Sequence, residues 1–390
     1  MQVPNSAAEI LSAARQLADD IRERRLADEF EAHRQLPVDV VTRLRSAGVF
    51  RMNMPRIWEG PELTSMDQVR VIEALATADA SVAWCSFIWC DSGIYSGYLE
   101  DTVARQLYPQ LDLAQSGWIY PVGRADKVAD GYRLSGRWMF GSGVNHCDML
   151  AAGCTVYEDG EPCVTADGRT EWRILLAPPS AFEVEDTWYT TGLRGTGSHH
   201  YNVRDLVVPE ARSFSFAEPK REGALWARPD TLVRKMSGVP LGLARDAINC
   251  AVAILEGKTD RRTSAAYRDK IEVQKAVAIA ELKLSAARAY VFEALEAQWD
   301  RLERGQPLSE KERADPVLSR YLAFQTAREV AQLMYDTVGG EAVYANNPFD
   351  RHLRDATTMC QHIVGQEKSI YPVGRMLLGG DVSGELFLSG

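Results

Sequence analysis

The chain has 390 residues, of which 46% are hydrophobic and 25% charged, so it can bury a large core spread over two or three domains. Its formal net charge of −10 argues against nucleic acid as a partner, because an acidic surface repels phosphates. The seven cysteines form no CxxC pair, and we find neither a secretory signal nor a run of about 18 apolar residues, so we expect a cytoplasmic protein that does not contact a membrane.

Helical periodicity dominates the first part of the chain. Apolar residues recur at helical spacing over residues 10–21, and Pro37 and Gly48 are suited to begin and end a second helix. A third helix is expected over residues 66–78, followed by another for which Asp79 is a suitable N-cap. We therefore predict an N-terminal helical domain over residues 1–115.

Short strands are predicted from residue 116 onward. The Asp130-Gly131 dipeptide lies between two extended runs, which indicates a β-hairpin. Leu134, Gly136, Trp138 and Phe140 then alternate with their neighbours, as in a strand with two different faces. Further strands are expected over residues 149–156, 172–176 and 201–208. These patterns predict a central β-domain over residues 116–215.

The rest of the chain returns to helix. Apolar residues at a period of 3.6 mark one long helix over residues 273–295. A second is expected from Pro316 to Val338, ended by Gly339-Gly340, and a last one from Pro348 through His352 to Val364. Residues 216–390 are therefore predicted to form a helical bundle, and the fold class is α+β.

The usual nucleotide and metal motifs do not occur where their chemistry would need them. No GxGxxG follows a predicted strand, and there is neither a P-loop nor a GxSxG segment. His199 and His200 are adjacent in a strand, so their side chains point to opposite faces and cannot easily share a metal. We expect no metal site.

Three segments carry a resemblance that covers nearly the whole chain. They are MPRIWEGPELTSMDQVRVIEALATADASVAW (residues 54–84), TGLRGTGSHHYNVRDLVVPE (residues 191–210) and DTVGGEAVYANNPFDRHLRDA (residues 336–356). They resemble the acyl-CoA dehydrogenases, with Trp58-Glu59-Gly60 replacing a tyrosine and paired glycines. The resemblance implies an acyl-CoA dehydrogenase-like fold: a helical N-terminal domain, a central β-barrel-like domain and a C-terminal four-helix bundle.

The resemblance also implies a flavin between the β-domain and the bundle of a homotetramer or dimer. The Trp138–Gly143 segment (Trp138, Phe140, Gly141, Ser142 and Gly143) has small residues that let backbone N–H groups approach a flavin ring. Gly339 and Gly340 at a helix end would allow backbone to approach the rest of the cofactor, which favours FAD and leaves FMN open. Arg262 corresponds approximately to an arginine that reaches the flavin of a neighbouring subunit.

The segment after the RDA motif favours an oxygenase over a dehydrogenase. Acyl-CoA dehydrogenases carry a catalytic glutamate near this point, whereas residues 354–366 offer Gln361, His362 and Ile363 and no glutamate. The two-component flavin monooxygenases of the same fold have a histidine there, close to the substrate. A neutral imidazole can take a substrate proton near pH 7. The resemblance likewise places Ser142 near flavin N5, where its hydroxyl could hold a C4a-hydroperoxide.

The predicted enzyme is thus an oxygenase component that hydroxylates an aromatic or heteroaromatic small molecule, using molecular oxygen and flavin reduced by a separate reductase. His362 and Ser142 are the expected catalytic residues. Aromatic residues and one histidine could form the substrate pocket: Trp84, Phe87, Trp89, Trp118, Trp138 and His146. Three alternatives remain open: an amine N-oxygenase, an acyl-CoA dehydrogenase with a displaced base, and a non-catalytic binding protein that keeps the fold.

Overall fold

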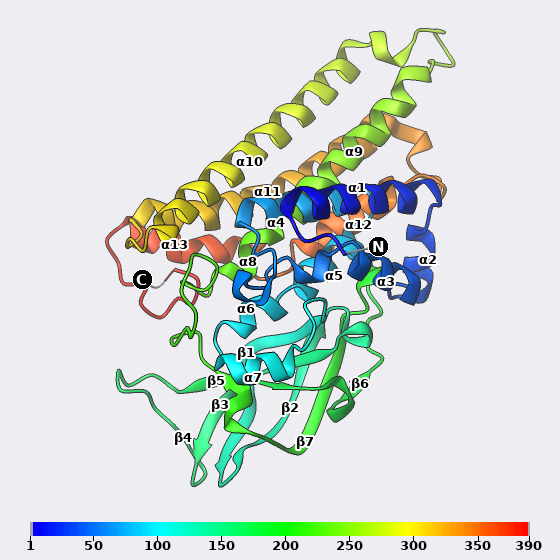
Figure 1. Ribbon diagram of the computed structural model, residues 1–390. Helices are drawn as coiled ribbons and strands as arrows, with labels where there is room; N and C mark the ends of the chain where they lie inside the picture. Colours follow the sequence, from blue (N-terminus) through cyan, green and yellow to red (C-terminus); the bar gives the residue numbers. More distant parts are fainter. Residues whose placement is uncertain (1–2, 389–390) are drawn as a thin grey trace.

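The computed structural model describes residues 3–388 and places a layer of helices against a β-domain (Figure 1). Asp79 caps the helix that follows it by accepting a hydrogen bond from the Val82 N–H, as predicted, and Ser6 and Thr64 cap two other helices in the same way. The N-terminal helices are α1 (Ala7–Glu23), α2 (Ala27–His33), α3 (Val38–Ser46), α4 (Ser65–Ala76), α5 (Ala80–Trp89), α6 (Ser92–Ser96) and α7 (Asp101–Leu107).

The β-domain is one sheet with the strand order β6-β7-β2-β1-β3-β5-β8, and β4 pairs with β3. Its strands are β1 (Gln115–Val128), β2 (Gly131–Gly141), β3 (Met149–Glu158), β4 (Glu161–Pro162), β5 (Trp172–Ala177), β6 (Glu183–Glu185), β7 (His199–Val208) and β8 (Ser213–Phe214). The predicted hairpin joins β1 to β2, and β1 pairs with β3 in parallel. The described strands form an open path with β6 and β8 at its edges, so the sheet is not a closed barrel.

Near the end of strand β2, a bulge changes the face of the sheet to which the side chains point. The ladder to β7 is irregular between Trp138 and Gly141, and Phe140 has a φ of +59°. A bulge of this kind turns the following side chain to the other face. Trp138 is therefore fully buried in the β-domain core, stacked on Tyr201, whereas Phe140 is 48% exposed. This corrects the prediction that Trp138 could line the substrate pocket, because its ring faces the interior of the β-domain.

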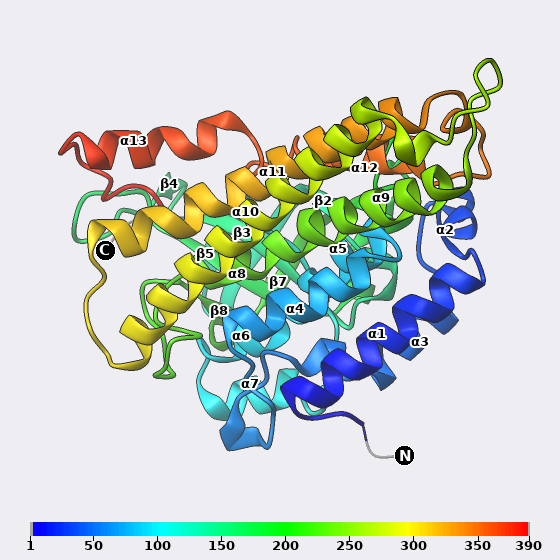
Figure 2. The ribbon, with the colours of Figure 1, turned by 90° about the horizontal axis from the view of Figure 1, so that it is seen from above.

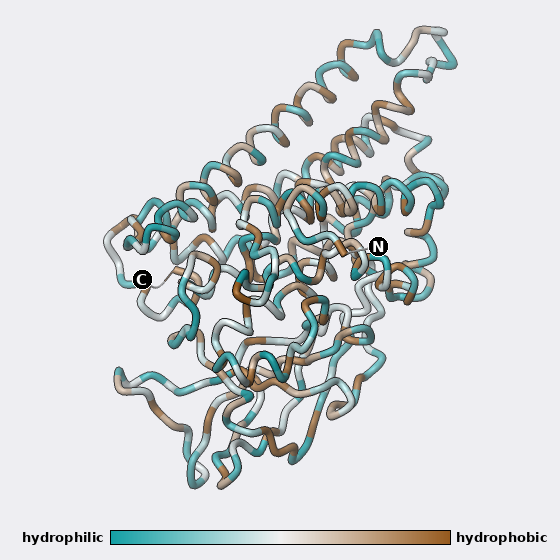
Figure 3. The backbone as a smooth tube through the Cα atoms, in the orientation of Figure 1, coloured by the Kyte–Doolittle hydropathy of each residue, from teal (hydrophilic) through white to brown (hydrophobic). Residues whose placement is uncertain are grey.

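The C-terminal helices cross over the sheet. They are α8 (Thr231–Arg234), α9 (Gly238–Gly257), α10 (Ile271–Glu303), α11 (Glu310–Val338), α12 (Phe349–Met359) and α13 (Tyr371–Leu377). Figure 2 shows α9, α10 and α11 side by side, and Figure 3 shows that the connection between α9 and α10 is largely hydrophilic at its projecting tip. The last predicted helix was expected to continue to Val364, but α12 ends at Met359. His362 consequently lies in the turn that follows the helix.

One helical stretch, Thr231–Gly257, is long and apolar enough to cross a membrane by length and composition alone. However, 67% of its most apolar window is buried inside the structure. It packs between the N-terminal helices and α11, as expected of a core helix in a large protein.

The Arg354-Asp355 pair joins the three regions of the fold. The Arg354 guanidinium binds the Glu31 carboxylate in α2 (2.6 and 2.9 Å) and the Thr191 carbonyl (2.7 Å). Asp355 is buried and accepts a hydrogen bond of 2.6 Å from the Leu193 backbone N–H. Two of the segments that carry the family resemblance, residues 191–210 and 336–356, therefore meet at this junction.

Candidate functional site

Trp84 links the two predicted catalytic residues. Its indole Nε1–H donates to the Ser142 hydroxyl at 3.2 Å, and its ring meets the His362 imidazole edge to face with centroids 5.4 Å apart. Trp84 comes from α5, Ser142 from the end of the sheet, and His362 from the turn after α12. The three parts of the fold therefore meet at one aromatic side chain, next to a hydroxyl and an imidazole.

The Ser142 hydroxyl belongs to a chain of three hydroxyl groups. Thr196 Oγ1 donates to the Leu193 carbonyl (2.8 Å), so it accepts from Ser198 (2.6 Å). Ser198 then has no proton left for Ser142, and the 2.7 Å contact between them is a bond donated by Ser142. A ligand that accepts from Ser142 must compete with Ser198 for this proton. Thr196 and Ser198 were not predicted as site residues, although both lie in the TGLRGTGS segment.

His362 is held as a neutral imidazole. Burial lowers its pKa to about 4, and the positive charge of Arg320 acts in the same direction. The Val364 backbone N–H donates to Nδ1 at 3.4 Å, which favours the tautomer with the proton on Nε2. To accept a substrate proton at Nε2, His362 must therefore move its own proton to Nδ1 and give up this long bond.

The residues around Phe140 fit a flat aromatic cofactor. Phe140 is half exposed, and Trp118 lies beside it with ring centroids 5.8 Å apart. The indole Nε1–H of Trp118 is buried and has no hydrogen-bond partner within residues 3–388, so a carbonyl or ring nitrogen of a flavin would satisfy it. These two side chains and the Ser142 hydroxyl would hold the ring.

Two backbone amides of this segment, which was predicted to approach a flavin, already have partners in the protein. The Ser142 N–H already donates to the Phe140 carbonyl and the Gly143 N–H to the Thr196 carbonyl, both at 2.8 Å. They are therefore not free to bind a flavin. Gly141 is paired with His199 across the strands, and a side chain on Gly141 would crowd the Tyr201 ring.

Gly143 is instead required for packing against Trp89. It has a φ of +67°, and a Cβ atom there would lie 2.4 Å from Nε1 of the Trp89 indole. Trp89 is fully buried and donates to the Gly143 carbonyl at 3.2 Å. His146 lies edge to face with Trp89 at 6.3 Å, its Nε2 buried and without a partner in the described chain. Trp89 thus supports the end of the sheet, and His146 stays a candidate ligand contact.

Arg262, Gly339 and Gly340 lie in connections that follow helices of the bundle. Arg262 is exposed in the connection between α9 and α10, which projects from the bundle (Figure 1), and Gly339 and Gly340 follow the end of α11. Lys258, at the base of this connection, donates to the Val338 carbonyl (2.6 Å), next to the two exposed glycines. Gly339 has a φ of +69° with open space around it. The structure does not bring these three residues to Ser142 and His362 within one chain.

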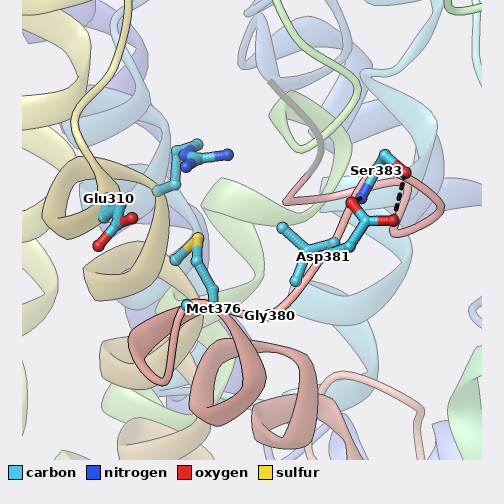
Figure 4. A pocket seen from close by; sticks show the side chains of 8 residues that line it. Glu310, Met376, Gly380, Asp381 and Ser383 are labelled. Atoms are coloured by element: carbon cyan, nitrogen blue, oxygen red, sulfur yellow. Dashed lines mark hydrogen bonds between the residues drawn. The ribbon is translucent and has the colours of Figure 1, made fainter.

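Two cavities lie near the C-terminal segment. The first, of about 290 Å³, contains none of the predicted site residues; its Asp381 carboxylate is bonded to Ser383 (Figure 4). The second, of about 310 Å³, is bordered by Ile363 and Val364, directly after His362, and by Arg320 of α11. Arg320 was not predicted as a site residue, because its position in the sequence is typical of an ordinary charged residue of a helix.

Carboxylates are scarce around His362. The first glutamate after the RDA motif, Glu367, is exposed on a short 3-10 helix (Glu367–Ile370). Within the described residues, no group of three or more His, Cys, Asp and Glu side chains is arranged to hold a metal ion. The site therefore offers a hydroxyl, an imidazole and aromatic rings as its chemical groups.

Comparison with known proteins identifies the family to which the chain is similar. Residues 5–102 match the N-terminal domain of the acyl-CoA dehydrogenases, and residues 235–367 match their C-terminal domain, so the two matches together cover more than half of the chain.

Relatives with known names match along nearly their whole length. The indole-3-acetate monooxygenase of Pseudomonas putida is 28% identical, over 96% of either chain. The FADH2-dependent resorcinol hydroxylase, oxygenase component, of a Rhizobium species is 26% identical, over 93% of this chain and 92% of that protein. The crystal structure of 3-HSA hydroxylase from Rhodococcus sp. RHA1 superimposes with a TM-score of 0.87 at 24% identity, over 96% of this chain and 97% of that chain.

Proposed function

This chain belongs to the acyl-CoA dehydrogenase family, in its flavin-dependent monooxygenase branch, and we propose that it hydroxylates an aromatic or heteroaromatic small molecule as the oxygenase component of a two-component system. The observation that carries the proposal is the contact of Trp84 with both Ser142 and His362. It joins a hydroxyl group, a neutral base and an aromatic wall that can stack on a flat substrate.

Reduced FAD, or FMN, would be held against Phe140, Trp118 and Ser142. Such a flavin supplies two electrons, so that one oxygen atom of O2 enters the substrate and the other leaves as water: RH + O2 + FADH2 gives ROH + H2O + FAD. The orphaned Trp118 N–H supports this placement, and the relative from Rhizobium is named as FADH2-dependent.

His362 would bind the substrate hydroxyl or ring N–H and take its proton. Its low pKa keeps the imidazole neutral at physiological pH and therefore able to accept. An acyl-CoA dehydrogenase would need a carboxylate here, and Glu367 is exposed and five residues further along the chain. The relatives named as monooxygenases favour the oxygenase in the same way.

We further propose a homotetramer in the cytoplasm. Arg262 in the connection between α9 and α10 and the Gly339-Gly340 pair after α11 make no contact with Ser142 or His362 in the described chain, and we expect them to reach a flavin bound by a neighbouring subunit. Exposed apolar side chains support such contacts: Leu282 of α10 is 68% exposed and Leu378, after α13, is 90% exposed.

A separate reductase would deliver reduced flavin by diffusion. The acidic chain and the free cysteines agree with a cytoplasmic enzyme that binds neither nucleic acid nor membranes.

The proposal is tested by mixing the protein with reduced FAD under anaerobic conditions and then with oxygenated buffer. We expect the absorbance of oxidised flavin to return more slowly than in free flavin, because the protein shields the reacting ring. Ser142→Ala removes the acceptor of the Trp84 N–H and should speed reoxidation at least about tenfold, the factor that corresponds to roughly 1.4 kcal/mol.

Ser96→Ala is the matched control, since Ser96 is a buried serine like Ser142 but donates only to the Gly93 carbonyl within its own helix. It should behave as the parent protein does. Reoxidation of the parent at the rate of free flavin, both with and without aromatic ligands, would refute the proposed function.

A further inference from the structure

The cavity beside His362 contains a buried cation without a counterion. Arg320 is only 3% exposed, yet its guanidinium has no hydrogen bond or ion pair within residues 3–388, and its Nε is fully enclosed without a partner. Burial lowers its pKa to about 10, which measures how unfavourable this environment is for a charge. An uncompensated buried guanidinium is expensive, so a ligand that neutralises it is expected.

The nearest acid does not serve as that counterion. Asp230 is buried close to Arg320, but its carboxylate already binds Arg234 at 2.6 Å and Gln298 at 2.8 Å. The Asp230 carboxylate is therefore already engaged by Arg234 and Gln298, and Arg320 forms no hydrogen bond or ion pair with it in the described chain.

The lining of the cavity extends this charge and adds apolar walls. Lys368 and Arg375 border the opening, and Glu385, 3.5 Å from Arg375, is the one acid among the lining residues within residues 3–388. The walls are mostly apolar and aromatic, as in Val317, Tyr371 and Phe387. A volume of about 310 Å³ suits a small molecule. The cavity therefore fits an anion with an apolar body.

We propose that Arg320 binds the carboxylate of an aromatic acid, so that the substrate of this enzyme is an aromatic acid and not a neutral phenol or indole. A guanidinium can hold both carboxylate oxygens at once, which fixes the direction of the attached ring. Ile363 and Val364 border the cavity and directly follow His362 in the chain, and the charge of Arg320 acts on the His362 imidazole, so a ring bound beside Arg320 would lie near His362. This inference rests on the proposed function, because it assigns the substrate of that same site.

Binding of the acid would also increase the basicity of the His362 imidazole. The charge of Arg320 contributes to the low pKa of this imidazole. A carboxylate on Arg320 offsets that charge and makes His362 a stronger base while the substrate is present. The enzyme would thus gain basicity when its substrate is bound.

The test compares acids with their neutral amides on the full chain. Benzoate, phenylacetate and indole-3-acetate, each against its amide, are titrated by calorimetry. We expect at least one acid to bind ten to a hundred times more tightly than its amide, as for a charge-assisted bond of about 1.5–3 kcal/mol. Arg320→Gln should remove this preference and leave amide binding unchanged, whereas Arg320→Lys should keep part of it. Equal binding of every acid and amide would overturn the proposal.

Arg328→Gln is the matched control, because Arg328 is an exposed arginine on the same helix. It should bind acids as the parent does. Arg320→Gln should also melt no lower than this control in the absence of ligand, since it removes an unpaired buried charge; a lower melting temperature would mean that Arg320 is paired in the folded protein, and would overturn the proposal.

A flavin phosphate is the other anion that Arg320 could bind. Anaerobic titration with reduced FAD separates the two: if Arg320→Gln weakens flavin binding and leaves acid binding unchanged, the anion is the flavin phosphate and the proposal is wrong. The slow reoxidation of bound flavin, measured without substrate, reports on the proposed function independently. Its absence in the parent protein would refute the oxygenase, whereas acid binding would still report on Arg320.

Discussion

His362 should remain uncharged when the pH is lowered from 7 to 5. With a pKa of about 4, only about one molecule in ten carries a protonated His362 at pH 5, whereas an imidazole with the ordinary value near 6.5 is almost fully protonated there. The two causes are burial, which is the larger, and the nearby charge of Arg320. The shift corresponds to roughly 3 kcal/mol against the charged form in the folded protein.

The sign of the effect on stability follows from proton binding. Between pH 4 and 6.5 the folded chain binds fewer protons at His362 than the unfolded chain does, so this residue makes the free energy of unfolding increase as the pH rises through that window. Above about pH 6.5 both states are neutral at this position and the contribution is constant. Acidification therefore weakens the fold through His362.

The assay is nuclear magnetic resonance of the ring Cε1 protons of the six histidines. The signal that is missing from the His362→Asn variant belongs to His362, and between pH 5 and 8 it should stay at the position of a neutral ring. In Arg320→Gln the midpoint should move upward, because the smaller of the two causes is removed, but it should stay below 6.5. A midpoint near 6.5 in the parent protein would refute the argument that burial keeps this base neutral.

Two further predictions concern the frame around the site. Gly143→Ala should lower the melting temperature more than Gly160→Ala does, because both positions have a positive φ but only at Gly143 would the Cβ meet a neighbour, the Trp89 indole; equal losses would show that the contact with Trp89 is unimportant. Burial raises the pKa of Asp355 to about 7, above its unfolded value, so its contribution to stability is present at low pH and is lost as the pH rises toward 7. In Asp355→Asn, whose side-chain oxygen can still accept from Leu193, thermal melts between pH 5 and 8 should fall less steeply with pH than in the parent protein, and an unchanged slope would contradict this assignment.

The elements of the fold were predictable where the pattern is local. Helical spacing over residues 10–21 and 273–295 indicates α1 and α10, and the Asp130-Gly131 turn indicates the hairpin between β1 and β2. The end of α12 was not predictable in this way. The helix stops at Met359 although no proline or glycine occurs before Gly365, so the pattern alone extends it past His362.

The faces of β2 show a second limit of pattern reasoning. Strict alternation places Trp138 and Phe140 on the same face, but the positive φ of Phe140 and the bulge beside it separate them. Local patterns also do not predict contacts between residues that are far apart in the sequence. Trp84 and Ser142 are 58 positions apart, and nothing in either segment alone indicates the hydrogen bond that joins them. The site therefore had to be assembled from the fold.

The position of Arg354 and Asp355 near the C-terminal end has a consequence for biosynthesis. As the chain leaves the ribosome, Glu31, Thr191 and Leu193 emerge long before the two residues that bind them. The pocket around Trp84 cannot be completed until residue 362 has been translated, because His362 follows this pair in the chain. A product terminated before His362 would thus leave the aromatic wall open to water, and the nascent chain would acquire its reactive centre only after the helical N-terminal domain and the sheet have been synthesised.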